Sequence, residues 1–94
     1  MPLSRFDIVA RAEPQTLMRL LNYFAQLSLL PSRVNAVEAE ESMTIRIEQP
    51  GLGEHQARVI AEKMRSSVLV EAVRVHRGRH LLVPLNGTTN DISA

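Results

Sequence analysis

The sequence contains no cysteine and no tryptophan, and only 3% of its 94 residues are aromatic. Without thiols the chain has no disulfides, no thiolate ligands for zinc or iron–sulfur clusters and no cysteine nucleophile. It also lacks an apolar stretch of roughly 20 residues, the length needed to cross a bilayer. The formal net charge is only +1. We therefore expect neither a nucleic acid nor a membrane as a partner.

What is present is enough for one folded unit. Hydrophobic residues make up 45% of the chain, and a chain of this size buries roughly 60–68% of its unfolded surface. The length predicts a single domain. The first residues, Met1 to Arg5, lack the long apolar run of a secretory signal, so a cytoplasmic location is expected.

Apolar residues follow two different periods along the chain, and the order of these periods predicts the fold. Segments with alternating apolar residues are expected to be strands, namely Phe6–Arg11, Arg33–Glu38, Met43–Glu48 and Val68–His76. Segments with apolar residues three and four apart are expected to be helices, from Glu13-Pro14 to about Ser28 and from Glu54 to Arg65. This order predicts an α+β, ferredoxin-like βαββαβ fold, in which two helices cover one face of a four-stranded antiparallel sheet.

The strand expected at Arg33–Glu38 has a special position in this fold. Right-handed crossovers place the first and third strands at the centre of the sheet, so this second strand lies at an edge. Its only edge protection is Pro31 near its start, and it carries no lysine. We therefore predict a homodimer or higher homo-oligomer formed by edge pairing. The expected interface residues are Arg33, Val34, Asn35, Ala36 and Val37.

The end of the chain differs from the rest in composition. The pattern assigns the folded domain to residues 1–80 and a C-terminal extension to residues 81–94. Leu81–Leu85 is an apolar run broken by Pro84, which favours an extra strand or a strap over the sheet. The polar residues from Asn86 onward are typical of a flexible tail.

The turn between the first strand and the first helix carries a family resemblance. Its sequence, Glu13-Pro14-Gln15-Thr16-Leu17-Met18-Arg19-Leu20-Leu21, resembles the corresponding stretch of ACT domains. The similarity extends from Phe6 to Val75 and includes the Val37–Glu48 hairpin and the closing strand Val70–Val75. Among ACT proteins the chain looks most like the short regulatory subunits of acetohydroxyacid (acetolactate) synthase, which act in branched-chain amino acid biosynthesis.

The resemblance implies a non-catalytic regulatory domain that binds an amino acid effector at a dimer interface and modulates a large catalytic subunit. A helix start attracts a carboxylate through its unpaired amides and partial positive charge. The expected ligand-binding residues lie at the two ends of the first helix: Glu13, Pro14, Gln15, Thr16, Leu17, Ser28, Leu29 and Leu30. No catalytic residue, cofactor or metal is expected.

Two departures from the family pattern leave an alternative open. Gln15 stands where effector-binding members have a glycine, and Ser28 is followed by leucines and Pro31 instead of a polar turn. Both changes narrow the expected pocket, because glycine lets a ligand approach the backbone closely. The alternative is a ligand-free interaction subunit that dimerises and stabilises a catalytic partner.

Other functions of this fold class lack their residues here. An RNA-binding module stacks bases on aromatic side chains of its sheet, but the residues expected to face outward carry no ring: Asp7, Val9, Arg11, Thr44, Arg46 and Glu48. This mixed-charge face is expected to be a solvated surface or a docking patch for a larger protein. A metal chaperone needs a cysteine pair. His76 and His80 are four residues apart, but Arg77-Gly78-Arg79 makes a poor helix for a metal site.

Overall fold

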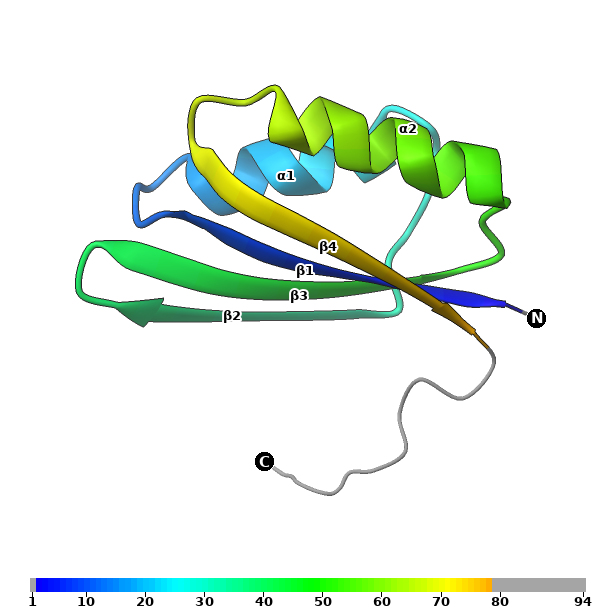
Figure 1. The fold of residues 1–94 in the computed structure, drawn as a ribbon, viewed down its shortest axis with the longest axis horizontal. Coiled ribbons are helices and arrows are strands. Elements are labelled where there is room, and N and C mark those ends of the chain that lie inside the picture. Colours follow the sequence, from blue (N-terminus) through cyan, green and yellow to red (C-terminus); the bar gives the residue numbers. More distant parts are fainter. Residues whose placement is uncertain (1, 79–94) are drawn as a thin grey trace, which may run out of the picture.

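The computed structural model describes residues 2–78 of the chain (Figure 1). Its elements are β1 (Leu3–Arg11), α1 (Thr16–Ala25), β2 (Arg33–Ala39), β3 (Ser42–Pro50), α2 (Glu54–Arg65) and β4 (Val70–Gly78). The predicted order of strands and helices is confirmed. The predicted extension at 81–94, with its possible strand at 81–85, lies outside the described residues. Within residues 2–78, no helix is long and apolar enough to span a membrane.

The four strands form one antiparallel sheet in the order β2-β3-β1-β4. This order confirms that the first and third strands are central and that β2 is an edge strand; β4 forms the other edge. Both helices lie on one face of the sheet, above it in Figure 1, and no described element covers the opposite face, called the open face below. Because α2 packs on β4 and α1 packs beside α2, α1 lies toward the β2 side.

The core lies between the helices and the sheet, where the alternating residues predict it. Phe6 and Ile8 of β1 and Ile45 and Ile47 of β3 have no exposed surface. The helices contribute Leu20, Phe24, Ile60 and Met64 to the same cluster, along with Ala57 and Ala61. The rings of Phe6 and Phe24 meet edge to face, with centroids 5.4 Å apart. This pair joins α1 to the central strand of the sheet.

Helix α1 is shorter at both ends than the sequence predicts. The prediction that it begins at Glu13-Pro14 is wrong: Gln15 is the N-cap and Thr16 is the first helical residue. A turn precedes it, in which the Thr16 amide donates to the Glu13 carbonyl at 3.1 Å. At the other end Ser28 has a positive φ of 59°, and the Leu29 amide donates to the Phe24 carbonyl at 2.9 Å. This pattern closes the helix and accounts for its stop three residues before Ser28.

Helix α2 matches its prediction from Glu54 to Arg65. Gly53 is its N-cap, and the Gly53 amide donates to Oε1 of Gln56 at 3.2 Å. Glu54 lies in the first turn, with Lys63 and Arg65 in the last. These charges complement the helix dipole, which favours anions at the start and cations at the end.

Candidate functional site

The turn between β1 and α1 is held together by its own side chains. Nε of Arg11 lies 3.4 Å from Oε2 of Glu13, and Nε2 of Gln15 donates to Oε1 of Glu13 at 3.2 Å. Gln15 itself is exposed at the start of the helix. The Glu13 carboxylate is therefore fixed beside the first turn of α1.

Thr16 has a structural role in this turn. It has no exposed surface, and its hydroxyl donates to the Arg11 carbonyl at 2.8 Å. Since its amide donates to Glu13, both of its donors are used inside the protein. The amides of Leu17 and Met18, in the first turn of the helix, have no intrahelical acceptor. Thr16 therefore holds the turn in place, and the amides of Leu17 and Met18 remain available to a ligand.

Replacing Thr16 by valine is expected to lower the free energy of unfolding by about 0.5–1.5 kcal/mol, because the Arg11 carbonyl loses one of its two donors and keeps only the Glu13 amide. Thr16→Ser keeps the hydroxyl and should retain most of the stability. Urea unfolding followed by circular dichroism measures both. A larger loss in Thr16→Ser than in Thr16→Val would show that the methyl group, and not the hydrogen bond, stabilises the turn.

The other predicted ligand residues lie at the far end of α1. A helix of ten residues is about 15 Å long, so Ser28, Leu29 and Leu30 are well separated from the β1–α1 turn within one chain. Leu29 packs against the core, whereas Leu30 is 85% exposed. The eight predicted ligand residues thus form two groups, one at each end of the helix, and a single chain does not bring them together.

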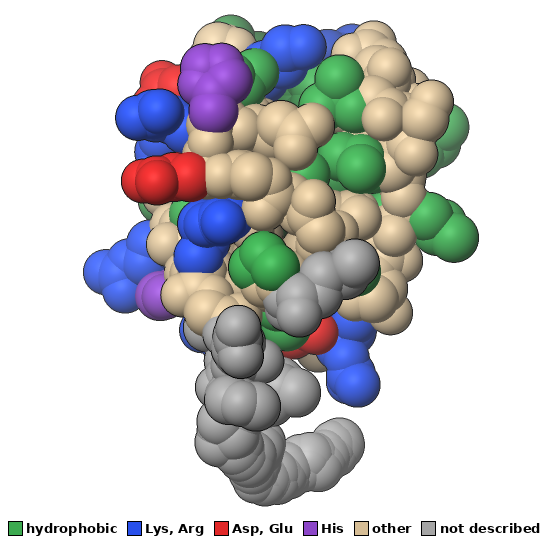
Figure 2. Space-filling view, turned by 90° about the vertical axis from the view of Figure 1, so that its right-hand side faces the viewer, with side chains coloured by type: hydrophobic (Ala, Val, Ile, Leu, Met, Phe, Trp, Pro, Cys, Tyr) green, Lys and Arg blue, Asp and Glu red, His purple; other side chains and the backbone are tan. Residues whose placement is uncertain are grey.

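Strand β2 is exposed along its whole length. All seven of its residues are exposed. Val34 and Ala36 face the helix side of the sheet, since they pair with buried residues of β3. Val37 is 57% exposed on the open side. Figure 2 shows the end of the molecule where α1 leads into β2, and hydrophobic side chains gather on the right of that view. The side chains of the predicted interface strand are therefore exposed on both faces of the sheet, and they include the apolar residues Val34 and Val37.

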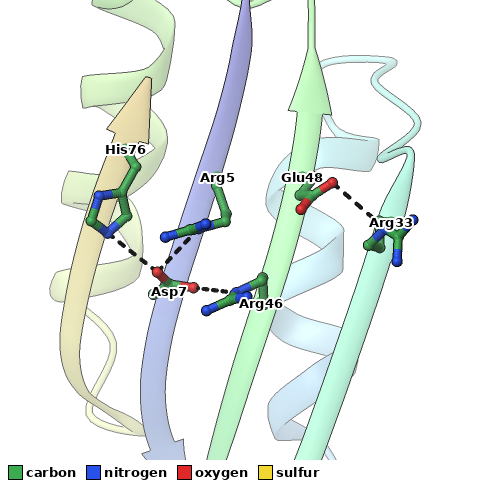
Figure 3. A network of polar contacts seen from close by, with 6 residues as sticks. All are labelled: Arg5, Asp7, Arg33, Arg46, Glu48 and His76. Atoms are coloured by element: carbon green, nitrogen blue, oxygen red, sulfur yellow. Dashed lines mark hydrogen bonds and ion pairs between the residues drawn. The ribbon is translucent and has the colours of Figure 1, made fainter. Parts of the chain in front are cut away.

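The open face of the sheet carries a network of ion pairs, shown in Figure 3. The carboxylate of Asp7 lies 2.8 Å from Nε of Arg46, 3.2 Å from Nε2 of His76 and 3.3 Å from Nε of Arg5. A second carboxylate, that of Glu48, lies 3.7 Å from Nε of Arg33. The alternation in the sequence placed several of these residues outward. Apart from the pair of Arg5 and Asp7 within β1, the ion pairs join residues of different strands and depend on the register between these strands.

A depression of about 540 Å³ lies at the opposite end of the sheet, near the β2–β3 turn. Its lining is mostly acidic and includes Arg11, Glu13, Glu40, Glu41 and Glu71. Among residues 2–78 there is no group of three or more histidine, aspartate or glutamate side chains arranged to hold a metal ion. His80, one of the two histidines considered for a metal site, lies outside that range.

Solved structures with this fold include two single domains of other proteins. The ACT domain from GTP pyrophosphokinase of Chlorobium tepidum has a TM-score of 0.69 and 11% identity, covering 79% of this chain and 96% of that one. The C-terminal domain of the MgtC protein from Mycobacterium tuberculosis has a TM-score of 0.68 and 11% identity, covering 89% of this chain and 95% of that one. At these identities the similarity shows the fold alone.

A homoserine dehydrogenase from Thiobacillus denitrificans also contains the fold, with a TM-score of 0.64 and 17% identity over 82% of this chain and 17% of the enzyme. No curated protein matches the sequence. The family model described as an ACT-like domain matches residues 2–82, which is most of the chain. With the βαββαβ order and the β2-β3-β1-β4 sheet described above, this match shows that the chain belongs to the ACT-like domain family.

Proposed function

We propose that this chain is a non-catalytic regulatory domain, formed by residues 1–80 and followed by an extension. In this proposal it dimerises through β2, binds a small amino acid at the interface and modulates a biosynthetic enzyme such as acetolactate synthase. The observation that carries the proposal is the complete exposure of β2, whose outer backbone edge is unpaired within the described sheet. Such an edge favours pairing with a second copy.

A two-fold axis beside β2 supports one shared site between the copies. Antiparallel pairing of β2 with its partner continues the sheet and sets the two α1 helices side by side in opposite directions. The start of one α1 then lies near the end of the other. Glu13–Leu17 of one copy and Ser28–Leu30 of the other would form the pocket that a single chain lacks.

The chemistry of these two groups fits an amino acid. The amides of Leu17 and Met18 at the positive end of α1 favour the ligand carboxylate. The Glu13 carboxylate beside them is the natural partner for the ligand ammonium group. Leu30, 85% exposed in one chain, offers an apolar contact to an aliphatic side chain from the second copy. Branched-chain amino acids are therefore the ligand class that we propose.

The proposed regulation is a shift between two orientations of the copies. A ligand that contacts both copies binds one orientation better and increases its population. A catalytic subunit that docks on the dimer would sense this change. The size of the effect is limited by the difference in ligand affinity between the two orientations.

A thermal-shift titration with leucine, isoleucine, valine and phenylalanine tests the ligand. An amino acid at 100 times its dissociation constant stabilises the folded state by about 2.7 kcal/mol. For a domain of this size we expect a rise in melting temperature of roughly 10 °C or more. Leucinamide, which lacks the carboxylate, is the matched control and should give little shift. An equal shift with leucinamide would argue against the helix start as the binding group.

The ligand-free alternative is favoured by two observations. Both donors of Thr16 are already used in the turn, and Gln15 occupies the glycine position of effector-binding domains. In this second reading the dimer only holds a catalytic partner in its active form. Absence of any thermal shift at millimolar amino acid, together with a stable dimer, would select it.

A further inference from the structure

We propose that half of the open sheet face is a docking surface for an acidic segment of a partner protein. The inference rests on the proposed function for the existence of a partner, and it adds the face and the chemistry of recognition. The surface, called the charged patch below, consists of Arg5, Asp7, Arg33, Arg46, Glu48, Arg74 and His76.

The charged patch is built from two neighbouring rows that cross all four strands. In the first row Glu48 on β3 lies between Arg33 on β2 and Arg5 on β1, followed by His76 on β4. In the second row Asp7 on β1 lies between Arg46 on β3 and Arg74 on β4. Each carboxylate therefore has an arginine on either side. The patch contains four arginines and two carboxylates, which gives it an excess of positive charge.

The two carboxylates are recessed, as is Arg5 with 18% of its side chain exposed, whereas the other three arginines protrude. Only 7% of the Glu48 side chain and 25% of the Asp7 side chain are exposed, against 68% for Arg33 and 49% for Arg46. Arg74 is exposed as well. Burial of Glu48 corrects the expectation that it is a solvated outward residue. A partner approaching this face meets guanidinium groups before it meets the carboxylates beneath them.

The recessed carboxylates also orient the arginines. Arg33 and Arg46 both make their ion pairs through Nε. Their terminal Nη groups have no acceptor among residues 2–78. The planar guanidinium can accept a carboxylate across two parallel hydrogen bonds. Because the side chains are already held, less rotamer entropy is lost when a partner binds.

The spacing of the exposed arginines favours a protein segment over a single small anion. Arg46 and Arg74 lie two strands apart, which is about 10 Å, and Arg33 lies diagonally across from Arg46. One small anion cannot reach all three. Several carboxylates along one helix or strand can. A second copy of the same face is disfavoured, because it would set arginine against arginine.

Nucleic acid fits this face less well. Among the described residues of this face there is no phenylalanine, tyrosine or tryptophan on which bases could stack, and the ring of His76 is paired with the Asp7 carboxylate. The next row, containing Val9, Val37 and Ala72, is uncharged, and the acidic depression lies beyond it. Carboxylates there would repel phosphates and also an acidic protein segment. The partner is therefore confined to the half of the face occupied by the charged patch.

The test uses the full chain, labelled with ¹⁵N, and an octaglutamate peptide followed by NMR. We expect shifts of the Nε–Hε signals of Arg33 and Arg46 and of amides in β2 and β3. The double variant R46Q/R74Q should bind the peptide at least tenfold more weakly. Its matched control, R19Q/R58Q, removes two exposed arginines from the helices and should bind within twofold of the wild type. Arg74→Gln alone, which breaks no ion pair of the described residues, covers the case in which the double variant does not fold.

Several outcomes would overturn the proposal. One is an equal loss of octaglutamate affinity in R46Q/R74Q and R19Q/R58Q. Another is binding of octalysine as tight as that of octaglutamate. A third is the same set of NMR shifts with inorganic phosphate at equal concentration. Tighter binding of a short oligonucleotide would assign the face to nucleic acid, and a change of oligomeric state in R46Q/R74Q would assign it to self-association. Failure here is distinguishable from failure of the proposed function, because the leucine thermal shift reports on the other side of the sheet.

Discussion

Replacing Phe24 by alanine is expected to lower the free energy of unfolding by about 3–5 kcal/mol. Phe24 has no exposed surface, and its ring packs against Phe6 at an interplanar angle of 85°. The cavity would open between α1 and the central strand, where the surrounding β strand cannot collapse inward. Since small domains are stable by only about 5–15 kcal/mol, we expect a large fraction of unfolded chain near physiological temperature.

The measurement is urea unfolding, followed by circular dichroism, with Met18→Ala as the matched control. Met18 lies on the same helix, is 73% exposed and should change stability by no more than about 0.5 kcal/mol. A loss at Phe24 no larger than that at Met18 would mean that α1 is not packed on the sheet. It would then remove the basis for placing any site at the two ends of this helix.

The sequence predicted the sheet well because burial on one face imposes a period of two. Phe6 and Ile8 alternate with polar residues, as do Ile45 and Ile47, and all four are buried. The same physical cause, one face against the helices, produces both the pattern and the structure. The strand order followed from the handedness of the crossovers, which does not depend on the details of the side chains.

Details that depend on other parts of the chain could not be predicted. Helix α1 begins at Thr16 and not at the predicted Pro14, because the hydrogen bond from the Thr16 hydroxyl to the Arg11 carbonyl closes a turn before the helix. Two of the three partners of Asp7, Arg46 and His76, come from positions 39 and 69 residues away, on β3 and β4. Only the register brings these residues together, and a local pattern contains no information on register. Burial of Glu48 has the same origin, since its arginine neighbours lie on two other strands.

The two edges of the sheet differ in how well they are protected. On β4, Nη2 of Arg65 donates to the Val73 carbonyl at 3.0 Å, so α2 already occupies part of that edge. On β2, every residue is exposed, and Val34 retains 41% exposure beside the apolar flank of α1. A strand edge whose backbone groups are already bonded cannot pair with another chain, whereas an edge with unpaired N–H and C=O groups can. This asymmetry favours β2 as the interface of the proposed dimer.

Replacing Ala36 by lysine is therefore expected to convert the proposed dimer to monomer. Ala36 is exposed in one chain and faces the helix side of β2, so the monomer can accommodate a lysine there. In the dimer two lysines would meet near the two-fold axis, and a buried unpaired ammonium costs several kcal/mol. We expect the dimer dissociation constant to rise at least about 100-fold. Sedimentation velocity over a range of protein concentrations measures this change.

The matched control is Ala72→Lys, which adds the same charge to the other edge strand. Ala72 is exposed on β4, so this variant should remain dimeric and keep the wild-type unfolding curve. If Ala72→Lys dissociates the dimer and Ala36→Lys does not, the copies pair through β4. The two ends of α1 would then lie on opposite outer flanks of the assembly, far from any shared pocket. Because ligand binding depends on that pocket, the Ala36→Lys monomer should also lose the leucine thermal shift, which links the oligomeric state to the effector in one variant.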